Sequence, residues 1–323
     1  SALWIEGRFS LQFFANIVTD ETQRILVINS FKLAISVTLA TTLVSLPLAY
    51  ILTRFRFPGR GVFQGLILIP MIMPPFVGAI GMKQLFGLYG SINTFLVQAN
   101  LVDLADIAPA SFLDWFGGGF FGVVLLSTLH LYPIMYLNVS ASLANVDPSL
   151  EEAAENMGAS KTKLFFTITL PLMIPGYFAG AIIVFIWSFT DLGTPLIFDY
   201  YDVIAVRIFK QVSDINVNPS GYALVVLIIT LTAACFWVSK RMTASRQYAM
   251  VGRGHVGSRE NEAVGLTRWF IYAFMCGLGL LAILPHLSII MISLTPDASF
   301  LEPLEDIFPK QITFSHYGDV FQH

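Results

Sequence analysis

The residues best suited to recognising another protein lie in a polar stretch that begins at Asp147 in a mostly apolar chain. Asp147 can cap a helix, and Pro148 suits the first helical position. Glu152 would offer a carboxylate to a basic group, while the small side chains of Ala153 and Ala154 would let a partner approach the helix closely. The pattern indicates a docking surface rather than a centre of covalent chemistry.

A helical hairpin is expected to carry this surface. Gly158 would end the first helix, and a second helical run would begin at Ser160. Apolar residues follow at helical spacing until Pro171 and Pro175, which are expected to interrupt the second helix. The stretch 147–171 is therefore predicted to be a short helix, a glycine turn and a second short helix between two membrane spans.

The spacing within this stretch resembles the EAA loop of permease subunits in binding-protein-dependent ABC importers. The matching positions are Glu152, Ala153, Ala154, Gly158, Ile168, Leu170 and Pro171. The resemblance implies a cytoplasmic coupling loop that docks in a groove on an ATPase subunit. It also implies the type I ABC importer permease fold, with ATP and Mg²⁺ held by the ATPase and no cofactor on this chain. An amphipathic loop on the membrane surface is the alternative interpretation.

The composition independently places the chain in a bilayer. Hydrophobic residues make up 55% of the sequence and charged residues only 12%, whereas average usage is about 25% charged. Cys235 and Cys276 lie in apolar runs and offer neither a disulfide framework nor a zinc site, so no metal site is predicted. We expect an all-α, polytopic membrane protein without a nucleic-acid partner, and the resemblance places it in the bacterial inner membrane.

Six apolar segments are expected to span the membrane: 29–53, 62–86, 118–140, 174–196, 222–239 and 268–294. The second segment contains Pro70, Pro74 and Pro75, which a bundle tolerates only where neighbouring groups take up the freed carbonyls. Broken helices of this kind often line a pathway. Basic residues gather in alternate connections, so the positive-inside tendency places those connections, including the 147–171 loop, in the cytoplasm.

A short internal repeat indicates how the chain is organised. Residues 10–17 and 313–320 match in side-chain type at nearly every position, and both lie just outside the membrane. We infer that a second permease unit begins with the sixth span and is cut off, and that a leading span preceded Ser1. The expected divisions are a periplasmic segment (1–28), a first permease unit (29–241), a cytoplasmic linker (242–267) and a truncated second unit (268–323).

This organisation resembles permeases in which two EAA-bearing units are fused, as in importers of ferric iron, phosphonates and polyamines, although no second EAA loop is present. The resemblance implies ATPase subunits, a periplasmic solute-binding protein, a second permease unit and lipid as partners. Ferric iron is the expected solute, with a phosphonate, a polyamine or another small ion as alternatives. Tyr200, Tyr201 and Asp202 are a further candidate contact for the binding protein.

Other function classes have weaker support. The sequence contains no GxxxxGK[ST] phosphate loop, so ATP hydrolysis would fall to a partner subunit and the chain would not be an enzyme. For an intramembrane enzyme, the one weak candidate for a base and nucleophile pair is His130 with Ser127. A hydrogen-bonded packing role suits His130 better. A secondary transporter is the stronger rival, since it too uses broken helices, but it would not need an EAA loop.

The candidate translocation path combines one carboxylate with the broken span. Asp191 is the acidic residue expected at membrane depth, with Thr190 beside it, and an intramembrane carboxylate is by default a functional candidate. Pro74 and Pro75 complete the set. The competing interpretation of Asp191 is a carboxylate that caps a helix end.

Overall fold

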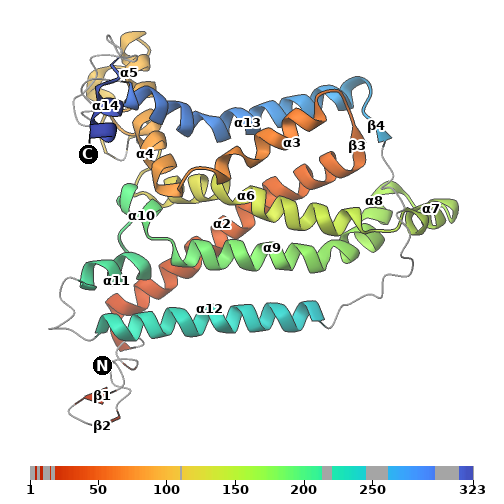
Figure 1. Cartoon of the computed structure of the whole chain (residues 1–323), viewed down its shortest axis with the longest axis horizontal. Helices are drawn as coiled ribbons and strands as arrows, with labels where there is room; N and C mark the ends of the chain where they lie inside the picture. Colours follow the sequence, from red (N-terminus) through yellow and green to blue (C-terminus); the bar gives the residue numbers. More distant parts are fainter. Residues whose placement is uncertain are drawn as a thin grey trace.

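A computed structural model of the chain describes residues 4–5, 8–9, 15, 19–109, 111–212, 220–244, 261–294 and 313–322. Most of these residues are helical, and the long helices form one bundle (Figure 1). Within the described residues, five helices are long and apolar enough to cross a membrane, and a pair bent by 97° becomes a sixth span if counted as one. The all-α, polytopic fold expected from the sequence is confirmed.

The bundle consists of long helices joined by short ones. The long helices are α2 (Glu21–Arg54), α6 (Phe120–Ala144), α9 (Leu170–Thr190), α12 (Ser220–Ala244) and α13 (Gly265–Ser293). The short helices of the outer connections are α5 (Ser91–Gln98), η2 (Leu104–Asp106), α10 (Gly193–Ile197), α11 (Ile204–Val212) and α14 (Ser315–Gln322). In the described part of the chain, four two-residue strands form two pairs: β1 (Trp4–Ile5) with β2 (Arg8–Phe9), and β3 (Phe55–Arg56) with β4 (Asn261–Glu262).

Helix α2 begins eight residues before the first expected span, so residues 21–28 of the expected periplasmic segment are helical. Asp20 caps the helix by accepting a hydrogen bond from the backbone N–H of Thr22 at 2.8 Å. Leu26 is then buried in an apolar cluster with Ile204 and Leu224. Asp20, Glu21 and Arg24 are exposed at the start of the helix, where it extends beyond its apolar part.

The second span is broken, as its prolines predict. Helix α3 (Arg60–Leu68) and the single 3₁₀ turn η1 (Ile69–Met71) lead into α4 (Pro75–Phe86), with the bend between the two halves. Pro74 has no N–H, so the carbonyl of Pro70 lacks its helical donor. His130 of α6 lies with Nδ1 2.8 Å from that oxygen, and the Tyr132 hydroxyl donates to the carbonyl of Ile67 at 3.0 Å. The packing role expected for His130 is confirmed.

Close packing between α6 and α9 depends on a glycine. A Cβ atom at Gly176 would lie 2.1 Å from Ser142 Oγ and 2.5 Å from the carbonyl oxygen of Asn138. Helix α6 is the most enclosed of the five long helices, with 67% of its apolar stretch buried. It therefore forms the centre against which α2, α9 and the broken span pack.

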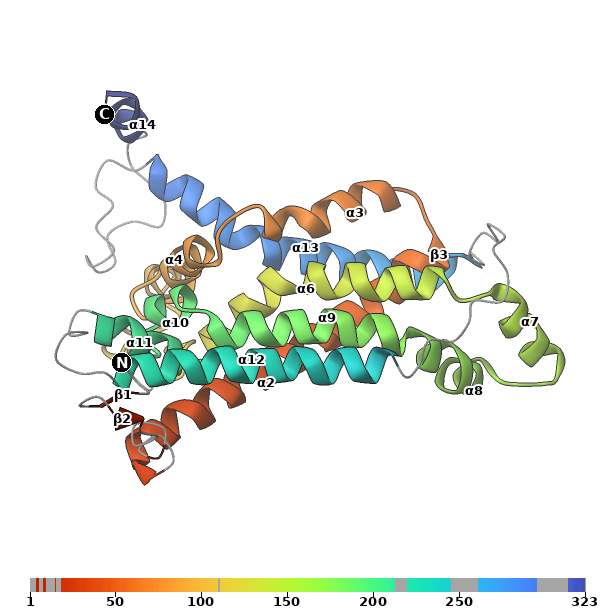
Figure 2. The ribbon, with the colours of Figure 1, turned by 60° about the horizontal axis from the view of Figure 1, so that its bottom comes forward.

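Helix α13 packs against both halves of the broken span and runs beside α3 and α4 (Figures 1 and 2). Its start at Gly265 precedes the expected residue 268. A Cβ atom at Gly81 would lie 2.3 Å from the carbonyl oxygen of Pro285, so the two helices approach to backbone contact. Residues 245–260 of the expected linker and nearly all of the first repeat copy lie outside the described residues.

Candidate coupling site

The polar stretch folds as a helical arm at one end of the bundle. Helices α7 (Pro148–Asn156) and α8 (Lys161–Leu164) lie at the end opposite α5 and α11 (Figures 1 and 2). Asp147 accepts a hydrogen bond from the backbone N–H of Ser149 at 2.9 Å, which caps α7 and holds the pKa of Asp147 below its usual value. Gly158 makes the turn with φ of +83°, a left-handed conformation that glycine adopts without strain.

The second helix of the arm is longer than expected. Helix α8 continues through one π-helical turn, η3 (Phe165–Thr169), into α9, so the helical run extends from Lys161 to Thr190. The prediction that Pro171 and Pro175 interrupt it is wrong. The π turn, in which the backbone N–H of Leu170 bonds to the carbonyl of Phe165, ends just before Pro171, and Pro171 lies in the first turn of α9. The arm is thus a direct extension of a membrane span.

The seven EAA positions divide between an outward and an inward face. Glu152, Ala153 and Gly158 are exposed, whereas Ala154 is only 4% exposed. The expectation that Ala154 faces a partner is therefore wrong, because it shares the inward face of α7 with Pro148 and Glu151 at a spacing of three. The remaining positions, Ile168, Leu170 and Pro171, are half-buried where the arm enters the bundle.

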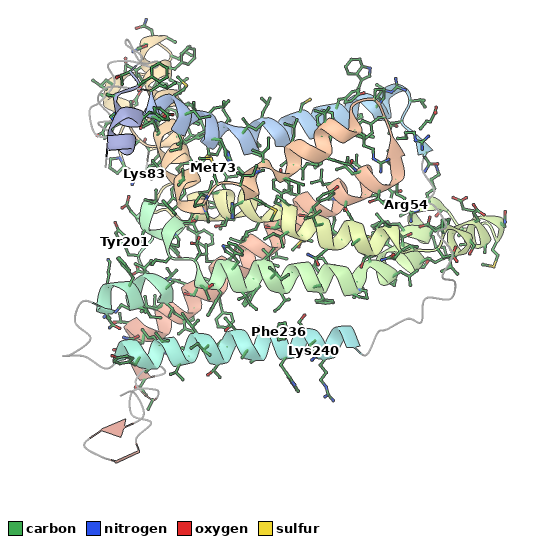
Figure 3. The ribbon with its side chains drawn as sticks, in the orientation of Figure 1. Arg54, Met73, Lys83, Tyr201, Phe236 and Lys240 are labelled. Carbon is green, nitrogen blue, oxygen red and sulfur yellow. The ribbon has the colours of Figure 1, made fainter. Side chains whose placement is uncertain are left out.

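A buried ion pair fastens the arm to the bundle. Arg54 Nη2, at the end of α2, lies 2.6 Å from Glu151 Oε1, and the two side chains are 4% and 9% exposed. The hydroxyl of Thr169 donates to the same Glu151 oxygen at 2.8 Å. Arg54 lies between the bundle and the arm in Figure 3. One carboxylate therefore joins α7 to the end of α2 and to the turn that begins α9.

The sequence interpretation missed this pair. Glu151 has a local explanation, because an acidic residue in a first helical turn complements the helix dipole. Arg54 also has a local explanation, because basic residues are common at the end of a span. The available signal was the position of Glu151, three residues before Ala154 on what proves to be the inward face of α7. A carboxylate on that face would need a partner.

The candidate path residues lie toward the other end of the bundle. Asp191 follows α9, and its Oδ1 accepts hydrogen bonds from the backbone N–H groups of Gly193 at 3.1 Å and Thr194 at 3.5 Å. This is the helix-capping role that was the competing interpretation. A Cβ atom at Gly193 would lie 2.9 Å from Phe76 Cβ, so the turn packs directly against α4. Thr190 and Pro74 are exposed, and Pro75 is half-buried.

A polar cluster ties the same end together. Lys83 Nζ lies 2.6 Å from Asp199 Oδ2, and the Tyr201 hydroxyl donates to Asp199 Oδ1 at 2.6 Å. That hydrogen bond raises the pKa of the Tyr201 hydroxyl. Figure 3 shows Lys83 and Tyr201 on this side of the molecule. The cluster therefore connects α4 to the loop between α10 and α11, where the sequence suggested a contact for a binding protein.

Residues 42–245 match the family of the binding-protein-dependent transport system inner membrane component. The chain belongs to this family. The molybdenum transport system permease protein ModB of Haemophilus influenzae is 30% identical over 246 residues, which cover 71% of this chain and 98% of that protein. The putative ferric transport system permease protein FbpB 1 of the same organism is 29% identical over 224 residues, covering 68% of this chain and 34% of that protein.

The fold of this permease also resembles a solved structure. The crystal structure of a bacterial ABC transporter involved in the import of the acidic polysaccharide alginate superimposes with a TM-score of 0.56 at 16% identity, covering 76% of this chain and 85% of that chain. Family and fold together confirm the predicted ABC importer permease, its type I fold and its inner-membrane location. The roles of the individual EAA and path residues stay predictions.

Asp191 can be tested because asparagine keeps its capping oxygen. In the permease variant Asp191→Asn, Oδ1 would still accept from Gly193 and Thr194, so the α9–α10 turn should survive while the charge is lost. We expect solute uptake to fall several-fold, with binding of the ATPase unchanged. Asp191→Ala, which removes charge and cap together, is the matched control. Normal uptake by Asp191→Asn would show that Asp191 only caps the helix and does not act in the path.

Proposed function

We propose that this permease works with ATPase subunits and a periplasmic binding protein, and that it moves a small inorganic ion inward by alternating access. The buried pair between Arg54 and Glu151 carries the proposal, because it makes the exposed Glu152 surface part of a rigid lever. ATP binding would close the ATPase subunits and carry the arm with them. Hydrolysis would then reset the inward-facing state.

The connections of the arm specify which spans would move. Helix α7 follows α6 after a short turn, and α8 continues into α9 without a break. Glu151 adds α2 through Arg54. A displacement of the arm would therefore tilt three spans that pack on one another, instead of bending a flexible loop. Because α6 also donates hydrogen bonds to the broken span, that span would follow.

Ferric iron is the first candidate solute. A further span, α13, follows the residues that match the family, as expected of a fused permease. The match to FbpB 1 covers 34% of that protein, as one unit of a fused permease would. Molybdate is the second candidate, because the match to ModB covers 98% of that protein. Both solutes would reach the permease on a binding protein.

The function is tested in vesicles that contain the complete importer, with radioactive iron or molybdate supplied on its binding protein. We expect ATP-dependent accumulation of iron and not of molybdate. Accumulation of molybdate alone would show that molybdate and not iron is the solute, and the proposed mechanism would stand. Accumulation without ATP, or a purified complex without an ATPase subunit, would favour a secondary transporter and end the proposal.

Reversing the charge of Glu152 tests the docking surface separately. Glu152 is exposed on α7, so Glu152→Lys should leave the fold and membrane insertion intact while it repels a basic partner group. We expect uptake to be abolished and co-purification of the ATPase to be strongly reduced. Glu152→Gln, which removes the charge without reversing it, should have a smaller effect. Normal ATPase binding and normal uptake in Glu152→Lys would contradict the assigned role.

A further inference from the structure

We infer that the coupling machinery extends beyond the arm to a strand clamp, formed by residues 55–58 and 261–263, which carries arm motion into α13. The inference rests on the proposed function, because it needs an arm that an ATPase moves. It concerns residues outside the EAA loop and a helix outside the residues that match the family.

The first step leads from the arm into the clamp. Arg54 is the last residue of α2 and Phe55 is the first residue of β3, so the ion pair with Glu151 is directly bonded to the clamp. The backbone N–H of Phe55 still bonds to the carbonyl of Ile51. A shift of Glu151 would therefore act on Phe55 through the Arg54 side chain and one peptide bond.

The second step crosses between distant parts of the chain. Strand β3 pairs in parallel with β4, with Phe55 opposite Asn261 and Arg56 opposite Glu262. The backbone N–H of Ala263, a residue only 1% exposed, donates to the carbonyl of Arg56 at 3.0 Å. An isolated pair of short strands is at best marginally stable in water. The packing around it must therefore hold this pair in place.

The third step leads from the clamp into α13. Arg268 Nε donates to the carbonyl of Ala263 at 2.8 Å, and the Tyr272 hydroxyl donates to the carbonyl of Pro58 at 2.9 Å. The ring of Phe57, which is 5% exposed, meets the Tyr272 ring edge to face at 5.8 Å. The first two turns of α13 are thus fixed to the segment that follows Arg54.

A cavity lies beside this route. A space of about 300 Å³ separates the arm from the start of α13, with Glu151 and Phe165 on one side and Glu262 and Val264 on the other. The hydrogen-bonded path passes around the cavity, through Arg54 and β3. It ends on the helix that packs against the broken span at Gly81.

A disulfide tests whether the clamp moves as one body. Phe55→Cys and Asn261→Cys place two thiols at opposed Cα positions, within the range of strand partners that a disulfide can bridge. The natural thiols are first removed by Cys235→Ser and Cys276→Ser. In the complete importer we expect equal cross-linking without nucleotide and in the ATP-trapped state, and unchanged uptake when cross-linked. A cross-link that forms in one state only, or that blocks uptake until it is reduced, would overturn the inference.

A second variant breaks the clamp instead of locking it. Ala263→Pro removes the N–H that donates to Arg56, whereas Ala263→Gly keeps it. We expect the importer that carries Ala263→Pro to retain its bound ATPase and the ATP hydrolysis of that subunit, while uptake falls several-fold. The importer with Ala263→Gly should couple hydrolysis to uptake better. Normal uptake by Ala263→Pro would refute the relay; if that variant fails to insert, the disulfide result decides. A wild-type importer without ATP-driven uptake would instead refute the proposed function.

Discussion

Glu151→Ala is expected to destabilise the permease more than any other single change in the arm. The substitution would leave the guanidinium of Arg54, only 4% exposed, without its carboxylate, and the hydroxyl of Thr169 without its acceptor. Breaking a buried ion pair by removing one partner costs about 3–5 kcal/mol. We expect a corresponding loss of stability in denaturant titration of the purified importer, together with loss of uptake.

A double variant separates the charge from the packing. Arg54→Met with Glu151→Leu removes both charges and keeps most of the volume, a replacement that is often neutral or stabilising for buried pairs. We expect this variant to recover most of the stability that Glu151→Ala loses. Thr169→Val should cost less, about 1.5–3 kcal/mol at most, because it removes one hydrogen bond to a charged group. Unfolding of Glu151→Ala at the wild-type denaturant concentration would show that the pair does not hold the arm.

Local signals were sufficient to predict the arm. Asp147 and Pro148 mark the start of α7, and Gly158 marks its end, and each acts through the backbone within one helical turn. The break in the second span was predictable for the same reason, because Pro74 removes a particular N–H. Length and hydropathy then place the spans, although helix ends such as Glu21 and Thr190 depend on caps and tertiary contacts that hydropathy does not include.

Pairings between distant residues could not be predicted from local signals. Arg54 and Glu151 lie 97 positions apart, and each has a sufficient explanation within its own helix. The strand clamp is harder still, because two strands of two residues produce no periodicity. The predicted interruption of the helix at Pro171 was wrong for a different reason. Proline breaks a regular α-helix, but one π turn before it changes the register of the hydrogen bonds. In this permease, the sequence patterns do not show which inward-facing side chains contact one another.

Gly158→Pro is expected to abolish transport while the protein still inserts in the membrane. Gly158 has φ of +83°, and its N–H donates to the carbonyl of Glu155 at 2.8 Å. Proline fixes φ near −65° and has no N–H, so it removes the turn and the hydrogen bond together. Helix α7 would then lose its fixed angle to α8, and motion of the docked surface would no longer reach α9. Uptake and ATPase binding in reconstituted vesicles measure this loss.

Two further substitutions at the same position identify the backbone as the cause. A Cβ atom at Gly158 would meet no other atom within 4 Å, so any effect of a small side chain must come from its conformational preference. Alanine pays about 1–2 kcal/mol for the left-handed conformation, whereas asparagine adopts it more readily. We therefore expect uptake to decrease in the order Gly, Asn, Ala, Pro. Equal uptake by Gly158→Pro and the wild type would mean that a rigid turn is not needed, and the lever would have to act through Glu151 and Arg54 alone.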